Sequence, residues 1–405
     1  MNIEDRVRPN LIFRNSTNSN GDVFVGIKLE ESSIQITFPV GFNISDNINE
    51  RRDDTIVLME IMKKYAELDG FVSELGFNST STNNFPVESY LYLIKHHLRY
   101  GYFYETEPTF SINSRGKINW QKTIKEVTPK IIDGNFLYFD FVIKNTINSE
   151  DSWISLVYEY CVYESFRLLG WMFTSYTPRE PRFFDFDQNA FRSIILRKTH
   201  ETFNDSNRQL FLHLLNIVES FQNGEVPIGY NFGTTKFEYV WEKIVNSCFN
   251  NVNKKEYLPR TYWKMKNDTE RLNAHLYPDT ILYYDNAYYI LDAKYYKYGI
   301  SGNVKDLPDS SSINKQIIYG EFIIEKLKSE SNVTVYNAFI FPTNKSINSN
   351  NVNIINIGEA TSDWINKTSP HTKIKAILID TKYLIKTELD FDKNVVLNLC
   401  KEISD

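Results

Sequence analysis

The segment from Tyr277 to Tyr298, YPDTILYYDNAYYILDAKYYKY, constrains the fold more than any other part of the chain. Two apolar runs flank Asp285-Asn286, and this pattern predicts a β-hairpin that turns at those two residues. Because residues two apart in a strand share a face, Asp292 and Lys294 are expected to project together. Asp279 opens the first strand, so the hairpin is expected to bring it beside Asp292. Two carboxylates and an ammonium group on one edge of a sheet favour metal-assisted hydrolysis of phosphodiesters.

A second Asp-x-Lys tripeptide, Asp380-Thr-Lys382, provides an internal comparison. It also lies in an apolar, strand-like run, ILIDTKYLI, but no Pro-Asp stands a hairpin's length before it. The other Pro-Asp of the chain, Pro308-Asp309, follows the first Asp-x-Lys instead. Only Asp279, Asp292 and Lys294 therefore complete the pattern. The alternative that stays open is an ordinary hairpin whose charges lie on a solvated face.

Helical patterns flank the predicted hairpin. Apolar residues recur at helical spacing in FEYVWEKIVNSCF, residues 237–249. Glu238 and Glu242 are four residues apart there, so either can face the hairpin or the solvent. A second amphipathic helix is predicted at residues 313–327, and apolar strands are predicted at VTVYNAFIF, VNIINI and KIKAILI. The order of helix, hairpin, helix and strands predicts an α/β core with a mixed sheet.

This arrangement resembles the PD-(D/E)xK nuclease superfamily and, within it, the LlaJI-type restriction endonucleases, relatives of the nuclease subunit McrC. The resemblance is carried by FEYVWEKIV, YPDTILYYDNAYYILDAKYY, KQIIYGEF and, far upstream, RGKINWQKTI. It implies two metal ligands, a catalytic lysine, a helical acid and two supporting polar side chains. In that order, these residues are Asp279 and Asp292, Lys294, Glu242 or Glu238, and Gln316 and Tyr319.

These groups predict a magnesium site. We expect Mg²⁺, for which Mn²⁺ would substitute, to be held by Asp279, Asp292 and the main-chain carbonyl of Ala293, with help from the helical acid. The ion would polarise the scissile phosphate and lower the pKa of a bound water. Lys294 would orient that water and stabilise the charge that builds on the phosphate.

The composition is that of a folded protein, with 405 residues, 42% of them hydrophobic and 15% aromatic. A chain of this length can form two or three domains. The opening MNIEDRVRPN is too polar for a signal peptide, and no apolar run approaches the roughly 20 residues that span a membrane. Cys161, Cys248 and Cys400 lie far apart, which predicts neither a zinc site nor a disulfide framework. We therefore expect a cytoplasmic protein with no membrane partner.

The formal net charge of −6 disfavours indiscriminate binding to double-stranded DNA, so contact with DNA would require a local basic surface. Two segments are candidates: RGKINWQKTIKEVTPK, and the stretch from Arg179 to Lys198. The candidate DNA-contacting residues are Arg115, Lys117, Trp120 and Lys122 in the first segment and Arg197 and Lys198 in the second. The alternative for both segments is an ordinary charged surface facing solvent.

Three parts are expected along the chain. Residues 1–130 are predicted to form a β-rich domain for partner docking or DNA recognition, with strands at VFVGIKL and SIQITFPVGF and a helix capped near Asp53 or Asp54. Residues 131–230 are predicted to be largely helical. Residues 231–405 are expected to hold the PD-(D/E)xK nuclease domain, which begins after the Gly/Pro/Asn-rich joint NGEVPIGYNFGTT.

The predicted function is a Mg²⁺-dependent DNA endonuclease, the cleavage subunit of a prokaryotic restriction or anti-phage system. The chain contains no GxxxxGK[ST] phosphate loop, so a motor would be another polypeptide, and the resemblance implies an AAA+ NTPase similar to McrB. Two alternatives stay open: an autonomous type II-like restriction enzyme, and a non-catalytic DNA-binding or scaffold subunit on a nuclease fold. Cleavage of both strands often pairs two active sites, which predicts a dimer in the active complex.

Overall fold

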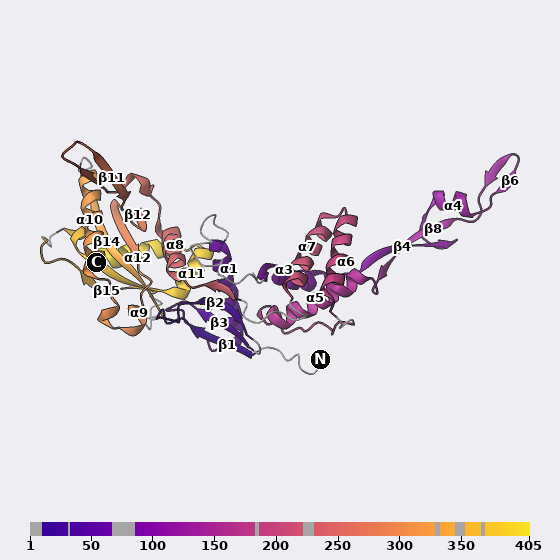
Figure 1. Cartoon of the computed structure of the whole chain (residues 1–405), viewed down its shortest axis with the longest axis horizontal. Helices are drawn as coiled ribbons and strands as arrows, with labels where there is room; N and C mark the ends of the chain where they lie inside the picture. The colour runs from indigo at the N-terminus through magenta and orange to yellow at the C-terminus, as the bar shows by residue number, and fades with distance from the viewer. Residues whose placement is uncertain are drawn as a thin grey trace. The chain divides into compact units, whose positions relative to one another are not determined.

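The protein divides into two compact units that combine helices with several sheets (Figure 1). One unit contains residues 1–9 and 83–228, and the other contains residues 10–82 and 229–405. The N-terminal strands thus lie in the same unit as the sheet formed by the C-terminal part of the chain. The division into domains at residues 130 and 230 stays a prediction. The computed structural model describes residues 10–30, 33–66, 86–182, 186–221, 231–328, 333–344, 353–365 and 369–405. Within these ranges no helix has both the length and the apolar character needed to cross a membrane.

A five-stranded sheet carries the candidate site. Its strands in spatial order are β12 (Thr280–Tyr284), β13 (Ala287–Ala293), β14 (Thr334–Thr343), β16 (Ile374–Asp380) and β15 (Ile354–Ala360). The three inner strands run parallel, and each edge strand runs antiparallel to its neighbour. The predicted mixed sheet is therefore confirmed, together with the three strands predicted downstream of the hairpin.

The predicted hairpin is the pair β12 and β13. Tyr284 pairs with Ala287 across the turn, and Thr280 pairs with Leu291 at the open end. Asp285 and Asn286 form the turn with φ of 47° and 60°. Two positive φ values are what a two-residue type I′ hairpin turn requires, and Asp and Asn tolerate them better than other residues with a side chain.

Helices pack against this sheet. Helix α8 (Phe237–Phe249) contacts β12 and β13, and α10 (Ser310–Lys326) contacts β13 and β14. Helix α12 (Asn394–Ser404) contacts β14, β15 and β16. Trp241 of α8 is fully buried and donates its indole N–H to the carbonyl of Ile340 at 3.4 Å. The two predicted flanking helices are confirmed. Helix α10 starts at Ser310 because the side chain of Asp309 accepts from the Ser312 N–H at 3.0 Å, so the second Pro-Asp is a helix cap.

A four-stranded sheet in the same unit is built from the N-terminal segment. Its spatial order is β1 (Asn10–Asn15), β3 (Ser33–Phe38), β2 (Val25–Leu29) and β9 (Asn231–Thr234), with β1 parallel to β3. The strands expected at β2 and β3 are confirmed.

The helix that follows the N-terminal strands, α1 (Ile48–Ala66), packs against α11 (Thr381–Leu389). The cap predicted at Asp53 or Asp54 is wrong, because the helix starts five residues or more earlier, where the Asn47 side chain accepts from the Asn49 N–H at 2.8 Å. Asp54 instead lies inside the helix, fully buried, and accepts from the Lys382 ammonium at 2.6 Å.

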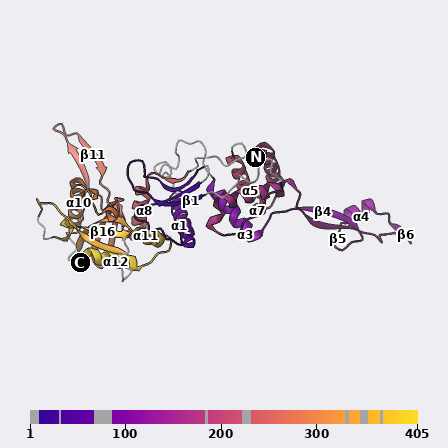
Figure 2. The ribbon, with the colours of Figure 1, turned by 90° about the horizontal axis from the view of Figure 1, so that it is seen from below.

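The other unit contains a helical group and an arm of strands. The helices are α3 (Val87–Tyr100), α5 (Trp153–Leu169), α6 (Gln188–Glu201) and α7 (Asp205–Ser220). The arm contains β4 (Glu105–Ile112), β5 (Lys117–Ile118), α4 (Trp120–Glu126), β6 (Lys130–Ile132), β7 (Asn135–Leu137) and β8 (Val142–Ser149), and it projects from the helices in both views (Figures 1 and 2). Helices were expected from residue 131 onward, but β7 and β8 lie there instead. The reversal at Asp133-Gly134, with φ of 48° and 81°, starts a hairpin rather than a helix.

Candidate active site

The open end of the hairpin brings together the residues predicted from its sequence. Asp279 lies next to β12, and its Oδ2 accepts a hydrogen bond from the main-chain N–H of Ala293 at 2.8 Å. Asp292 is buried at 6% exposure, and its Oδ2 lies 2.6 Å from the Lys294 Nζ. The Lys294 N–H continues the pairing of β13 with β14 by donating to Ile340 at 2.9 Å, so the chain stays extended through the lysine. Both carboxylates and the ammonium group therefore lie at one end of the hairpin.

The carboxylates of this cluster disfavour one another's charge. Burial raises the pKa of Asp279 to about 7, and the charges of Asp292 and Glu242 add to the rise, against the hydrogen bond from Ala293 and the charge of Lys294. Burial, followed by the charge of Asp292, also raises the pKa of Glu242. Burial disfavours the charged form of Lys294, but Asp292 outweighs it and holds the pKa of Lys294 above its ordinary value.

The two acids of α8 differ in their surroundings. The charge of Glu242 raises the pKa of Asp279, and Asp292 in turn raises the pKa of Glu242. Glu238 acts on Glu242 and contributes to the raised pKa of Tyr295. Of the two acids that the sequence analysis left open, Glu242 is thus the one that interacts with the hairpin carboxylates.

Helix α10 donates two side-chain hydrogen bonds to the main chain of the hairpin segment, one in β13 and one just before β12. The Gln316 Nε2 donates to the carbonyl of Ile290 at 2.8 Å, and the Tyr319 hydroxyl donates to the carbonyl of Tyr277 at 2.8 Å. Each of these carbonyls lies two residues before one of the carboxylates. Gln316 is almost fully buried at 1% exposure, so its amide serves the main chain of β13. This contact positions β13, and a role of Gln316 in catalysis stays a prediction.

Lys254, which the sequence analysis missed, supplies a second ammonium group. It lies in the short 3₁₀ helix Lys254–Glu256, and its Nζ donates to the carbonyl of Asp279 at 2.5 Å and to the Asn246 Oδ1 at 2.7 Å. Burial lowers the pKa of Lys254, and the charges of Asp279 and Glu242 oppose that change. No motif marks this lysine, since it reaches the site only because the loop after α8 returns to the start of β12.

The donor set suits a hard cation that keeps several water ligands. Within the described ranges, no group of three or more His, Cys, Asp or Glu side chains is arranged to hold a metal ion by itself. Asp292 Oδ2 is buried and has no hydrogen-bond donor in satisfactory geometry, its close contact being the ion pair with Lys294. Mg²⁺ is commonly bound through one or two carboxylates and waters, and a cation would relieve the repulsion between Asp279, Asp292 and Glu242.

The first basic segment lies in the arm of the other unit. Arg115 and Lys117 are exposed, and Trp120 is 54% exposed at the start of α4. The Lys122 Nζ lies 3.6 Å from the ring centroid of Phe110 and 3.8 Å from the Glu126 carboxylate, which places it in a local cation–π and ion-pair contact. Contact of these residues with DNA stays a prediction.

The second basic segment is occupied by ion pairs. Lys198 lies 2.6 Å from Glu105 and 3.0 Å from Glu201, and Arg197 lies 3.9 Å from Glu201. The neighbouring acids neutralise these cations locally, which weakens their attraction for phosphates. DNA contact by Arg197 and Lys198 stays a prediction.

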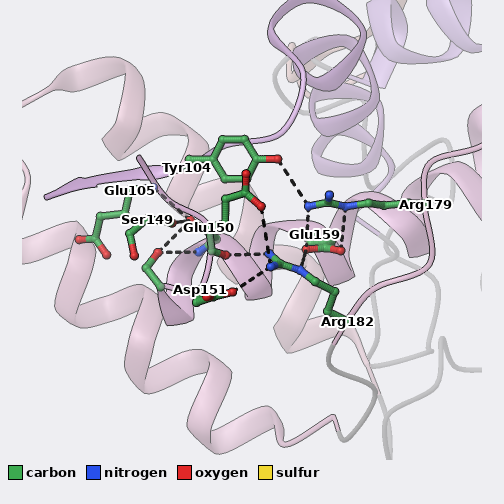
Figure 3. A network of polar contacts seen from close by, with 10 residues as sticks. Tyr104, Glu105, Ser149, Glu150, Asp151, Glu159, Arg179 and Arg182 are labelled. Carbon is green, nitrogen blue, oxygen red and sulfur yellow. Dashed lines mark hydrogen bonds and ion pairs between the residues drawn. The ribbon is translucent and has the colours of Figure 1, made fainter. Parts of the chain in front are cut away.

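The start of this segment has a structural role, as Figure 3 shows. Glu159 of α5 is 1% exposed and accepts from Arg179 and from Arg182, each at 3.1 Å. Arg182 also contacts Asp151 at 2.9 Å and donates to the carbonyl of Glu150 at 2.7 Å. A buried carboxylate needs such partners, so these two arginines hold the loop before α6 onto α5.

Comparison with known proteins places these features in context. The profile of the LlaJI restriction endonuclease family matches residues 24–379. The protein named type II restriction enzyme BsuMI component YdjA, from Bacillus subtilis (strain 168), is 27% identical over 362 residues, which cover 82% of this chain and 75% of that protein. A solved assembly of Thermococcus gammatolerans McrB AAA+ hexamers with bound McrC contains a chain that is 14% identical with a TM-score of 0.34, over 94% of this chain and 82% of that chain. A TM-score this low carries no argument about fold or partners.

Proposed function

The chain belongs to the LlaJI restriction endonuclease family, and we propose that it hydrolyses phosphodiester bonds of double-stranded DNA with a divalent cation. The observation that carries the proposal is the convergence of Asp279, Asp292, Glu242 and Lys294 at one end of the hairpin. The mixed sheet and its flanking helices would then be a PD-(D/E)xK core, and a cytoplasmic location would give it access to DNA.

Each group has a role that its surroundings support. Asp279, Asp292 and the main-chain carbonyl of Ala293 would hold Mg²⁺, and Mn²⁺ would substitute because it accepts the same oxygen ligands. When bound, such an ion polarises the scissile phosphate and lowers the pKa of a coordinated water. Because Asp292 keeps Lys294 protonated, the lysine acts as a charged donor that orients the water and stabilises the phosphate, and it does not act as the base.

Asp279 links the site to pH. With a pKa of about 7, its carboxyl is partly protonated at neutral pH, and it must lose that proton to bind a cation. Activity is therefore expected to rise with pH through about 7 and to reach a plateau above it. The Ala293 N–H holds the Asp279 Oδ2, which leaves the other carboxylate oxygen for the ion.

The experiment that tests the proposal is cleavage of plasmid DNA with Mg²⁺ or with EDTA. Asp292→Ala is expected to abolish cutting while the far-UV spectrum stays that of the wild type and a cooperative melting transition shows that the variant is folded. Glu242→Ala and Glu238→Ala form a matched pair on one helix face, and only the first is expected to lose activity. Wild-type cutting by Asp292→Ala in Mg²⁺ would show that the site is elsewhere.

We further propose that the chain acts with a separate AAA+ NTPase of the McrB kind. The Bacillus subtilis relative is named a component of a restriction enzyme, and no phosphate loop occurs in this sequence. The arm carries a group of strongly exposed apolar side chains, and exposed apolar surface is typical of a protein contact. These side chains include Ile112, Trp120, Ile131, Phe136 and Phe139, each at least 54% exposed.

Mixing the chain with the NTPase and DNA distinguishes NTPase-dependent cleavage from autonomous cleavage and from binding without cleavage. If the NTPase drives cleavage, cutting requires it and a nucleoside triphosphate, and Phe136→Asp should lower the cutting rate of that mixture. Cutting at full rate by the chain alone would instead identify an autonomous type II-like enzyme. DNA binding without cutting in any mixture would identify a non-catalytic subunit. We propose that two copies of the chain are present in the complex that cuts both strands, and the measured mass of the protein–DNA complex tests this.

A further inference from the structure

A pocket of about 450 Å³ lies in the same unit as the candidate active site, within the size range of small-ligand sites. Its walls come from the residues that follow four strands. Asn15 ends β1, and the other lining residues follow strands: Ser16, Thr17 and Ser19 follow β1, Val40 and Gly41 follow β3, Lys297, Ile300, Ser301, Asn303 and Asp306 follow β13, and Asn344 follows β14. Because β1 runs parallel to β3 and β13 runs parallel to β14, the pocket lies at carboxyl ends of parallel strands, where open α/β sheets bind ligands.

The pocket is close to the candidate active site along the chain. Lys297 lines the pocket and is three residues after Lys294, so the two Cα atoms are at most about 11 Å apart. One DNA strand advances about 3.4 Å per nucleotide, so the pocket lies within about three nucleotides of a phosphate bound at Lys294.

Hydrogen bonds fix the walls in the absence of a ligand. The hydroxyl of Thr381 donates to the carbonyl of Val40 at 2.9 Å, and the Val40 N–H donates to the hydroxyl of Tyr295 at 2.8 Å. The hydroxyl of Thr343, which precedes the lining residue Asn344, donates to the carbonyl of Gly299 at 3.0 Å. Both threonines are fully buried, so a ligand would enter a preformed site and would bind without the cost of ordering it.

The lining has no net charge. Lys297 and Asp306 are the charged groups among the pocket residues, and they lie 3.8 Å apart as an ion pair. Such a lining gives little attraction for a phosphate or a triphosphate, whose charge would meet Asp306 as well as Lys297. The pocket therefore suits a neutral ligand with apolar faces and a few polar edges better than an anion.

The remaining residues have the chemistry of a base-reading site. The Asn15 Nδ2 donates to the carbonyl of Phe42 at 2.6 Å, so its oxygen is left as an acceptor, and the Asn303 Oδ1 accepts from the Lys305 N–H at 3.1 Å, so its amide nitrogen is left as a donor. Asn344 adds a third carboxamide, and Asn side chains read the edges of bases. Val40 and Ile300 add apolar surface for the face of a ring. We propose that this pocket receives one base of the DNA strand that occupies the active site, extruded from the stack, and that it determines sequence preference beside the cut. This inference rests on the proposed nuclease function.

The test measures binding of free deoxynucleosides, so it does not depend on cleavage. Saturation-transfer NMR is recorded on the full chain in EDTA with deoxyadenosine, deoxycytidine, deoxyguanosine, thymidine and dATP. Ile300→Trp fills the pocket, and Ile357→Trp is the control, because Ile357 is a similarly exposed isoleucine on β15 (37% against 42%). Melting curves establish that both variants are folded.

At least one deoxynucleoside is expected to bind the wild type and Ile357→Trp at millimolar concentration and to bind Ile300→Trp at least tenfold more weakly. Deoxyadenosine and dATP are expected to bind with affinities within a few fold of each other, since the lining is neutral. No deoxynucleoside binding to the wild type, or equal binding to Ile300→Trp, would overturn the proposal. Binding of dATP tenfold tighter than deoxyadenosine would also overturn it, in favour of a phosphate site. If nucleosides bind but the wild type cuts no DNA, the nuclease proposal fails instead.

Discussion

Replacing Asp279 by Asn should stabilise the metal-free protein at alkaline pH while it abolishes cleavage. The substitution removes the carboxylate charge but keeps an oxygen that can accept from the Ala293 N–H. Above pH 7 the wild-type carboxylate is ionised although burial and the charges of Asp292 and Glu242 oppose this. The Asn variant has no such charge, so its folded state is free of the repulsion.

The size of this effect follows from the pKa. In the unfolded chain the carboxyl titrates near its ordinary value of 3.8, and in the folded protein it titrates at about 7. Between these values the unfolded chain releases the proton and the folded protein keeps it, so the free energy of unfolding falls as pH rises. At about 1.4 kcal/mol per pH unit, the loss is about 4 kcal/mol, and it is complete above pH 7. Because Asp292 and Glu242 relax when the charge is removed, we expect the Asn variant to be about 2 to 4 kcal/mol more stable than wild type at pH 8.5.

Urea unfolding in EDTA at pH 5 and at pH 8.5 measures this. At pH 5 the unfolded wild-type carboxyl is already ionised, so Asp279→Asn should be more stable than the wild type by about 1 to 2 kcal/mol, and the difference should reach its full size at pH 8.5. Adding Mg²⁺ at pH 8.5 should stabilise the wild type by about 2.7 kcal/mol at 100 times the dissociation constant, and should stabilise the variant much less. Asp309→Asn is the control, since Asp309 also follows a proline but is an exposed helix cap whose pKa is lowered by its hydrogen bonds to the main chain at Ser312 and the hydroxyl of Ser311. Equal or lower stability of Asp279→Asn at pH 8.5 would refute the reasoning.

Three further substitutions test the support of the site. Lys254→Met removes the donor to the Asp279 carbonyl and a positive charge beside the Asp279 carboxyl. The acidic limb of the pH–rate profile should therefore move to higher pH, whereas Lys254→Arg should keep that limb near its wild-type position. Gln316→Ala removes the side-chain donor to the buried carbonyl of Ile290 and should lower the free energy of unfolding in urea by about 1 to 3 kcal/mol, with weaker cutting. An unchanged unfolding midpoint would show that the bond is dispensable. Asn286→Ala places an alanine at φ 60° and should cost about 1 kcal/mol with cutting unchanged, because the turn is at the far end of the hairpin.

Local patterns were enough to predict the frame of the site. The turn at Asp285-Asn286 depends on the conformations that these two residues tolerate, and the alternation on each side sets which residues face together. Helix α8 follows from its own apolar spacing, and its packing on β12 and β13 is the consequence of that stripe. These features depend on interactions between neighbours in sequence, so a single sequence contains the information for them.

Features that depend on distant residues were missed. Lys254 reaches the site through a loop that returns to β12, and the start of α1 is set by Asn47 rather than by the more conspicuous Asp54. The charges of Arg197 and Lys198 are as prominent in the sequence as those of an exposed basic patch. Their neutralisation by Glu105 and Glu201 depends partly on β4, a strand that lies about 90 residues earlier in the chain.

The two Asp-x-Lys tripeptides show what a motif needs in order to become a site. Asp292 and Asp380 both lie near the carboxyl ends of parallel strands of one sheet, β13 and β16. β13 ends at Ala293, but the Lys294 N–H still donates to the carbonyl of Ile340, so no helix begins there and the Lys294 ammonium lies 2.6 Å from Asp292. After Asp380 a helix begins: the Asp380 side chain accepts from the Tyr383 N–H at 2.7 Å, and Lys382 turns to Asp54. Because a helix rotates by about 100° per residue, the second aspartate and lysine cannot share a face. The pairing that persists at Lys294, together with the carboxylate of Asp279 just before β12, therefore distinguishes the candidate site from the second Asp-x-Lys tripeptide.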